Sequence, residues 1–368
     1  MDVKFRCSQC FRKIAAGVEY KGQKINCPAC NKELVVPAAS FSIGRVIQGF
    51  TIEQFLGSGA MGEVYLAKQE TMNRDIALKI MTFENMQDED DRQRFVREVQ
   101  TLAKLNHPNI VSAISAGEFE EGSYLAMSYV NGSTVEDIIL KDGPIAEKES
   151  LRCVTAVADA LKYAWDNHKV LHRDIKPANF MIDSENEIHL MDMGIAKSMD
   201  SDYDITVAGM VMGTPYYMSP EQAAADTLDQ QSDIYSLGAS LYHMLAGEPP
   251  YKNGSPMQIM ADKLSKNPKD PKSVNPNISD RMCSLIKKFM AIDKEKRVKN
   301  WDEALELLKK AQAPKKKSQG KKIQVNAPSV STPRVKSGKV QQKKSPLPAI
   351  IIIVLIGIIA AVFISMSK

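Results

Sequence analysis

Hydrophobic and polar residues alternate early in the central region of the chain, and a helical repeat replaces this alternation further along. Three alternating, β-branched segments predict β-strands: residues 50–56, 62–67 and 76–80. Residues 88–105 are charged, with apolar side chains at helical spacing, and predict a helix. Helical periodicity then dominates residues 131–310, most clearly at 149–167 and 301–310. Strands followed by helices predict an α+β fold with two lobes.

The C-terminal segment, residues 347–366, is uncharged and almost wholly apolar. A helix of this length spans about 30 Å, the thickness of the hydrocarbon core of a bilayer. A buried core helix would have a polar face, so the segment predicts one transmembrane helix. Lys343 and Lys344 precede it, whereas only Lys368 follows it. The positive-inside rule therefore predicts a single-pass protein of the cell (inner) membrane with the preceding chain in the cytoplasm.

The net charge of +4 is unevenly distributed along the chain. Residues 1–40 and 311–346 are basic, whereas residues 41–310 carry more acidic than basic groups. A nucleic-acid-binding protein carries its positive charge on a folded face, so no nucleic-acid partner is expected. Residues 311–346 are rich in Lys, Ser, Pro and Gln, which predicts a disordered basic linker. Adhesion of this linker to anionic lipid is an open alternative to a purely connecting role.

Four of the six cysteines lie near the N-terminus in two Cys-x-x-Cys pairs: Cys7 with Cys10, and Cys27 with Cys30. Each pair presents two thiolates, and two pairs complete a tetrahedral set of ligands. Residues 1–40 are therefore predicted to be a compact four-cysteine module that holds a structural Zn²⁺ ion and resembles a small bacterial zinc ribbon. A redox pair is the alternative interpretation.

Residues 171–194 contain the groups that phosphoryl transfer from Mg·ATP requires. Asp174 is followed by Lys176 and Asn179, and Asp192 precedes a glycine further on. The reaction needs a base that orients the attacking hydroxyl and oxygen ligands for the metal ions on the phosphates. The order and spacing are those of a catalytic and metal-binding loop.

A glycine-rich loop of the form G-x-G-x-x-G precedes this stretch. Dinucleotide-binding folds use the same pattern, but their loop opens a helix, whereas here the chain continues as a strand. Lys79 lies on the next predicted strand and could reach beneath the loop. The nucleotide-binding residues predicted in the loop are Leu56, Gly57, Ser58, Gly59, Ala60, Met61, Gly62, Glu63 and Val64.

Because they contain these motifs, residues 50–310 resemble a protein kinase domain. The resemblance is greatest to the kinase domains of bacterial membrane-anchored Ser/Thr kinases, which are related to eukaryotic protein kinases. The resemblance implies the bilobal kinase fold and ATP-dependent phosphorylation of Ser and Thr in protein substrates, including the chain's own activation segment. It implies that Lys79 contacts the α- and β-phosphates and pairs with Glu98.

The same resemblance assigns roles in the central motif. Asp174 is the base that orients the substrate hydroxyl, and Lys176 balances charge on the transferring phosphate, which favours Ser/Thr specificity. Asn179 and Asp192 hold the Mg²⁺ ions. Met193 stands where the family usually has Phe, and it is apolar and flexible enough to fill that position.

The resemblance also covers the segments around this motif. Met127 corresponds to the gatekeeper, and the backbone of Ser128 and Val130 is expected to bond adenine. In the activation segment Thr206 is the preferred acceptor of phosphate, Ser198 and Ser201 are alternative acceptors, and Thr214 is expected to position substrate. Two further expectations concern structural residues: a buried Glu221–Arg297 bridge, and an Asp233 that anchors the catalytic loop beside Arg173.

Two alternative functions stay open from the sequence: a pseudokinase scaffold, and an adaptor that acts through its zinc module without nucleotide. A membrane-tethered pseudokinase scaffold would have the same domain order, but it would lack one of Lys79, Asp174 or Asp192, and none is missing. A homodimer is a partner that the sequence neither requires nor excludes.

Overall fold

The computed structural model describes residues 2–7, 10, 12–17, 20, 22–36, 40–59, 62–82, 96, 99–193 and 215–313. Within these ranges no helix combines the length and the apolar character needed to cross a bilayer. The predicted disordered linker, residues 311–346, starts too early, because residues 311 and 312 still belong to the last helix, Trp301–Gln312. The rest of the linker from residue 314 onward and the predicted span 347–366 lie outside the described residues, so both stay predictions.

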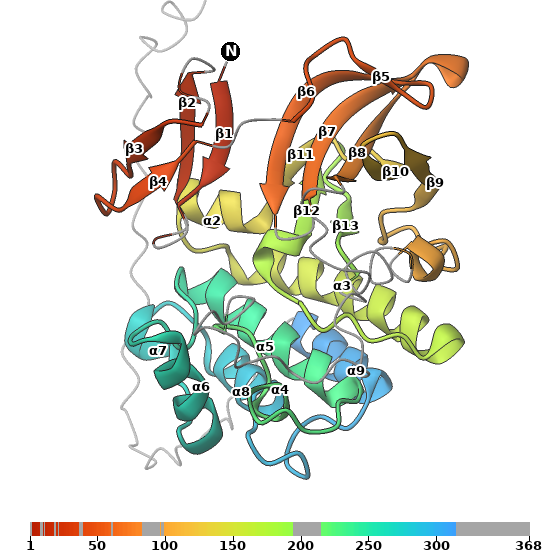
Figure 1. Cartoon of the computed structure of the whole chain (residues 1–368). Helices are drawn as coiled ribbons and strands as arrows, with labels where there is room; N and C mark the ends of the chain where they lie inside the picture. Colours follow the sequence, from red (N-terminus) through yellow and green to blue (C-terminus); the bar gives the residue numbers. More distant parts are fainter. Residues whose placement is uncertain are drawn as a thin grey trace, which may run out of the picture. The chain divides into compact units, whose positions relative to one another are not determined.

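The N-terminal module consists of two antiparallel hairpins (Figure 1). The first pairs β1 (Asp2–Arg6) with β2 (Lys13–Gly17), and the second pairs β3 (Lys24–Asn26) with β4 (Glu33–Val35). Its small core contains Cys7, Cys27, Ile14, Leu34 and Val36. So few apolar side chains bury little area, and the core of a module of this size contributes little stability by itself.

A six-stranded antiparallel sheet follows in the order β5-β6-β7-β8-β10-β9. Its strands are β5 (Val46–Ile47), β6 (Phe50–Gly59), β7 (Gly62–Gln69), β8 (Arg74–Thr82), β9 (Ala113–Phe119) and β10 (Gly122–Ser128). The three strands predicted from alternation fall within β6, β7 and β8 and are confirmed. Gly62 has φ +117°, and a Cβ there would lie 2.1 Å from the Ile80 carbonyl oxygen, so the strand start requires glycine.

The remainder is mainly helical, with one small sheet. Its elements are β11 (Gly132–Thr134), α2 (Val135–Asp142), α3 (Glu147–His168), β12 (Phe180–Asp183), β13 (Ile188–Leu190), α4 (Pro220–Ala223), α5 (Gln230–Ala246), α6 (Pro256–Ser265), α7 (Pro271–Val274), α8 (Asp280–Phe289) and α9 (Trp301–Gln312). The helices predicted at 149–167 and 301–310 are confirmed as parts of α3 and α9. Of the helix predicted at 88–105, residues 96 and 99–105 are described: 96 and 99–102 are helical, whereas 103–105 are not, so the helix ends three residues before the predicted boundary.

The domain has two separate hydrophobic cores, one in its β-sheet part and one in its helical part. One lies within the six-stranded sheet and includes Ile52, Tyr65 and Leu78. The larger core belongs to the helical part, where α5 is buried along almost its whole length (Figure 1). Helices α5 and α8 approach so closely at Gly238 that a Cβ there would lie 2.6 Å from the Cβ of Phe289.

A buried ion pair joins α4 to the loop before α9. The Arg297 guanidinium donates to the Glu221 carboxylate at 2.7 and 3.2 Å, and both side chains are almost inaccessible. Ser232 Oγ donates to the same carboxylate at 2.7 Å. Burial opposes ionisation of Glu221, but Arg297 outweighs it and keeps the pKa of this carboxyl below its usual value. The predicted bridge is confirmed.

Removing one partner of this pair should destabilise the domain strongly. We expect Arg297→Met to lower the free energy of unfolding by about 3–5 kcal/mol, because it leaves a buried carboxylate without its counter-charge. The effect should be present at neutral pH and fade as the pH falls through the lowered pKa of Glu221, since the protonated acid needs no counter-charge. Urea unfolding measures both.

Lys310→Met is the matched control, because Lys310 forms an exposed ion pair with Glu306. Exposed pairs of this kind contribute about 0–1 kcal/mol. Equal losses for Arg297→Met and Lys310→Met would contradict the assigned importance of the buried pair.

Candidate functional site

The predicted glycine-rich loop is the hairpin that joins β6 to β7. Gly59 and Gly62 pair at the strand ends, and the tip residues Ala60 and Met61 lie outside the described residues. A Cβ at Gly57 would meet no atom within 4 Å, so the space beside the hairpin is open. Of the remaining loop residues, Leu56 and Val64 are half-buried and Ser58 is exposed. The backbone here can be approached closely by a ligand.

Lys79 lies beneath this hairpin on β8. It pairs directly with Val64 of β7, so both side chains leave the same face of the sheet. The Lys79 side chain is 7% exposed, and its Nζ lies 3.8 Å from Oδ1 of Asp192, which is 54% exposed. Glu98, the predicted partner of Lys79, lies outside the described residues. The structure therefore places a buried ammonium group beside an accessible carboxylate.

The catalytic loop gathers Asp174, Lys176 and Asn179 around one carboxylate. Lys176 Nζ donates to Asp174 Oδ2 at 2.6 Å. Asn179, in the short 3-10 turn Pro177–Asn179, donates from Nδ2 to the Asp174 carbonyl oxygen at 2.7 Å and to Oδ2 at 3.3 Å. Asp174 keeps 28% of its side chain exposed. The carboxylate is oriented by two donors and can still be reached by a hydroxyl group.

Asp233 of α5 holds this loop from the protein interior. Its carboxylate accepts the backbone N–H groups of His172 at 2.7 Å and Arg173 at 2.9 Å. Arg173 has φ +63°, a left-handed conformation that costs free energy in a residue other than glycine. Burial raises the pKa of Asp233, against the effect of these donors. The two hydrogen bonds keep the backbone in place, which confirms the predicted anchoring role.

Backbone contacts connect the catalytic loop to the segment that carries Asp192. The Met191 N–H donates to the Asn179 carbonyl oxygen at 2.9 Å, and the His172 ring lies 3.0 Å from the Met191 carbonyl oxygen. Asp192 follows directly. Two predicted metal ligands, Asn179 and Asp192, are therefore held on adjacent, hydrogen-bonded segments.

The structure also describes Met193 and two residues predicted to lie near adenine, Met127 and Ser128. Met193 is 1% exposed and belongs to the large hydrophobic core, so it fills an apolar pocket as expected of the residue in the usual Phe position. Met127 packs against the same core. The Ser128 N–H donates to the Ser112 carbonyl oxygen at 3.0 Å, so adenine would meet Ser128 through its carbonyl group rather than its N–H.

Glu63 has a role that sequence reasoning missed. Its neighbour Val64 shares a face with Lys79, and alternation along β7 places Glu63 on the opposite face. Its buried carboxylate accepts the N–H of Ser40 at 3.0 Å and the hydroxyl of Tyr65. A contribution of Glu63 to nucleotide binding would therefore come from its backbone. No local pattern pointed to this contact, because the partner Ser40 lies far from Glu63 in the sequence, in the connector between β4 and β5.

Gln222 is a second residue that sequence reasoning missed. Ser219 and Gln222 form a capping box at the start of α4. The Gln222 side chain also donates from Nε2 to the Arg173 carbonyl oxygen at 2.9 Å, directly before Asp174. The Ser-x-x-Gln spacing was a readable capping signal. It gave no hint of the bond to the catalytic loop, which joins residues far apart in sequence.

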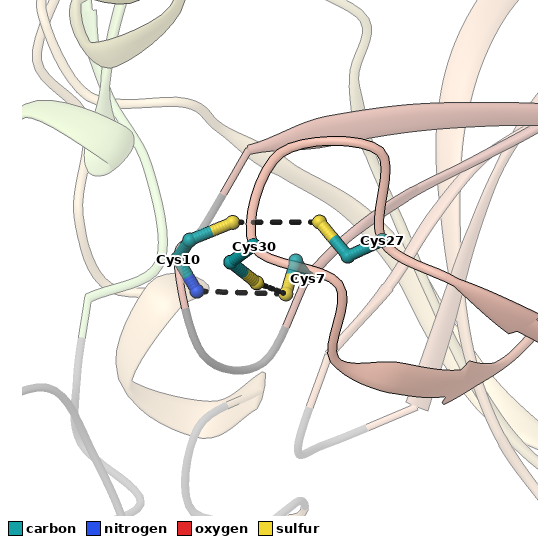
Figure 2. A group of neighbouring side chains, drawn as sticks. All are labelled: Cys7, Cys10, Cys27 and Cys30. Carbon is teal, nitrogen blue, oxygen red and sulfur yellow. Dashed lines mark hydrogen bonds between the residues drawn. The ribbon is translucent and has the colours of Figure 1, made fainter.

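The four N-terminal cysteines converge between the two hairpins (Figure 2). All four sulfur atoms lie within 4.8 Å of one another, with Cys7 Sγ 3.5 Å from Cys30 Sγ and Cys10 Sγ 3.5 Å from Cys27 Sγ. None of the four forms a disulfide. The Cys10 N–H donates to the Cys7 sulfur at 3.5 Å, as expected for a tight turn between the two cysteines of one pair.

The cysteine geometry fits a tetrahedral metal ion. Zn–S bonds of about 2.3 Å place the sulfur atoms of a site with four cysteine ligands about 3.8 Å apart. The two measured sulfur separations of 3.5 Å are close to that value. The donor set is soft and uniform, which suits zinc better than magnesium or calcium.

Comparison with known proteins identifies the class. A family model for the protein kinase domain matches residues 50–310, and the chain belongs to the protein kinase family. Serine/threonine-protein kinase PknB of Mycobacterium leprae is 37% identical over 252 residues, covering 67% of this chain and 40% of that protein. Serine/threonine-protein kinase PrkC of Bacillus subtilis is 36% identical over 252 residues, covering 68% and 39%.

A solved structure agrees with this result. The crystal structure of the Mycobacterium tuberculosis PknI kinase domain matches with a TM-score of 0.59 and 29% identity, and the match covers 74% of this chain and 100% of that one. The α+β kinase fold expected from the sequence is therefore confirmed. The chain spans about two fifths of the length of the curated relatives it matches.

Proposed function

We propose that this chain is an ATP-dependent protein kinase that transfers the γ-phosphate of ATP to Ser and Thr hydroxyls of proteins, using a domain formed by residues 50–310. The observation that carries the proposal is one connected set of groups. Lys79 faces Asp192 at 3.8 Å, and the neighbour of Asp192 is hydrogen-bonded to Asn179 of the loop that carries Asp174. Similarity to PknB and PrkC supports the same activity.

Asp174 is the proposed base. Its partly exposed carboxylate accepts a hydrogen bond from the incoming hydroxyl group and takes the proton as the oxygen–phosphorus bond forms and the bond to ADP breaks. Lys176, 2.6 Å from the same carboxylate, is close enough to balance negative charge on the transferring phosphoryl group. Ser and Thr are the proposed acceptors.

Lys79 is proposed to bind the α- and β-phosphates beneath the glycine-rich hairpin, with Glu98 as its partner. Asn179 and Asp192 are the oxygen donors proposed for Mg²⁺, and two such donors with phosphate oxygens suit this hard cation. Bound Mg²⁺ would supply charge neutralisation on the phosphates. Ser128 and Val130 are proposed to bond adenine through their backbone.

The activation segment is proposed as the chain's own substrate. Thr206 is the preferred acceptor, and both Thr206 and Thr214 lie outside the described residues. Arg173 stands next to Asp174 in the catalytic loop and is proposed to bind the phosphate once it is attached. A pseudokinase scaffold is not favoured, because Lys79, Asp174 and Asp192 are all present and come together in the fold.

The kinase proposal predicts autophosphorylation in trans or in cis with Mg·ATP. We expect Asp174→Asn to reduce incorporation of radiolabelled phosphate by about 10²–10⁴-fold, because the amide cannot accept the hydroxyl proton. Mass spectrometry should locate the phosphate on residues 194–214, chiefly at Thr206.

Asp166→Asn is the matched control, since it changes an acid of α3 whose only ion pair within the described part of the chain is to Lys162. It should leave incorporation unchanged. Equal incorporation by wild type and Asp174→Asn would rule out the proposed catalytic site.

We further propose that residues 1–40 hold a structural Zn²⁺ ion through Cys7, Cys10, Cys27 and Cys30. The convergence of four thiols without a disulfide supports this proposal. The module has a very small core. Zinc binding would add on the order of 10 kcal/mol of folding free energy to it.

The zinc proposal predicts about one zinc ion per purified chain. We expect Cys27→Ser to abolish stoichiometric zinc in elemental analysis and to make residues 1–36 sensitive to protease, because three thiolates hold the ion weakly. Cys283→Ser, which changes a buried cysteine of α8, should keep the zinc. Zinc retained in full by Cys27→Ser would reject the site.

We also propose that residues 347–366 form a single membrane helix that tethers a cytoplasmic kinase domain at the cell (inner) membrane, through a flexible linker that follows α9. The support is the uncharged composition of the segment and the lysines on its N-terminal side.

The membrane proposal predicts that the full chain stays with the membrane fraction after an alkaline wash. We expect Leu355→Arg with Ile358→Arg to release it, because each central arginine opposes insertion by about 2.5–3.5 kcal/mol. Leu355→Ile with Ile358→Leu should remain in the membrane. Full retention of the double-arginine chain would overturn the proposed span.

A further inference from the structure

Lys263 is a fully buried lysine that the proposed catalytic machinery does not use. It lies on α6, and its exposure is 0%. Within the part of the chain that the structure describes, no carboxylate comes within ion-pair distance of its Nζ. A lysine buried without a counter-charge is costly, and an apolar residue would pack at lower cost. The position therefore calls for a reason beyond packing.

The Lys263 ammonium has one hydrogen-bond acceptor and two aromatic neighbours. Nζ donates to the Tyr216 carbonyl oxygen at 2.9 Å. It also lies 4.5 Å from the ring centre of Tyr251 and 5.4 Å from that of Tyr235, distances at which aromatic faces attract a cation. Burial lowers the pKa of Lys263 to about 7, and both the ammonium and the amine can donate to a carbonyl group.

Tyr216 belongs to a short segment that is tied down along its length. The next residue, Tyr217, places its hydroxyl 2.7 Å from Nδ1 of His243 on α5. At the far end the Gln222 side chain donates to the Arg173 carbonyl oxygen at 2.9 Å. The segment 216–222 therefore stretches from Lys263 of α6 to the residue that directly precedes Asp174.

This placement puts the C-terminal end of the segment 216–222 directly beside the catalytic loop, where Gln222 bonds the residue that precedes Asp174. An acceptor hydroxyl that reaches the partly exposed Asp174 carboxylate brings its flanking peptide past the groups bonded to the catalytic loop. The nucleotide side of the site is built from other elements, namely Lys79 of β8 and Asp192. A shift of Tyr216 should thus change acceptor binding and leave ATP binding intact.

We propose that Lys263 is a positioning residue for the protein acceptor, acting through its hydrogen bond to the Tyr216 carbonyl oxygen. The inference rests on the proposed kinase function and deepens it: α6 sets the geometry of the segment 216–222, and this segment sets the affinity for the acceptor protein. Tyr235 and Tyr251 hold the Lys263 side chain in line with its acceptor.

The test compares the KM for the acceptor protein with the KM for ATP in wild type and in variants of Lys263. The acceptor is the full-length Asp174→Asn chain, which cannot label itself, and donor and acceptor are both kept in detergent micelles. We expect Lys263→Met to raise the KM for this acceptor about five- to tenfold, the scale of one lost hydrogen bond. The KM for ATP and the rate of ATP hydrolysis without acceptor should stay as in wild type.

Lys266→Met is the matched control, because Lys266 caps the same helix with an exposed ion pair to Asp262. It should leave both KM values unchanged. Lys263→Arg keeps the donor and the cation against the rings, so it should restore most of the acceptor affinity. Thermal melting of each variant checks that the fold is kept.

A folded Lys263→Met chain with an unchanged acceptor KM would overturn the inference, as would a parallel rise of both KM values. If Lys263→Met does not fold, Tyr251→Leu decides, because it removes the ring that lies 4.5 Å from the Lys263 Nζ: a shift of the acceptor KM alone supports the role, and no shift or a joint shift rejects it. Absence of any phosphate transfer by wild type would instead refute the kinase function itself.

Discussion

The buried carboxylate of Asp233 is the interaction on which the site depends. Its two hydrogen bonds fix the backbone of His172 and Arg173, and Arg173 is held in a left-handed conformation that it would not adopt freely. This backbone sets where Asp174 points and, through the His172 ring and Met191, where Asp192 stands. Helix α5 is buried almost throughout, so the carboxylate that it carries is a rigid reference point.

Buried charge recurs around the segment 216–222. Glu221 is neutralised by Arg297, which also stacks over the Tyr235 ring at 5.1 Å, and Lys263 approaches the same ring at 5.4 Å. Each of these groups loses hydration on folding, and only one geometry of donors and rings compensates for that loss. The result is a segment whose position is specified tightly at the point where it meets the catalytic loop.

The strands β6, β7 and β8 and the helices α3 and α9 were predictable because their periodicity is a local property of the chain. The catalytic loop was predictable for a similar reason, since Asp174, Lys176 and Asn179 lie within six residues of one another. Strands β9 to β13 carry weaker local signals, and two of their pairings, β10 with β8 and β11 with β12, join segments far apart in the sequence.

The sequence by itself determined the extent of the kinase domain, the chemical groups of the site and the spacing of the four cysteines. Only the tertiary structure decided which side chains meet. Glu63 turned out to bind the connector at Ser40 on the face opposite Lys79, and Lys263 turned out to hold Tyr216 across a gap of 47 residues. Such contacts depend on how elements pack, and packing is set by the summed burial of many residues rather than by any short pattern.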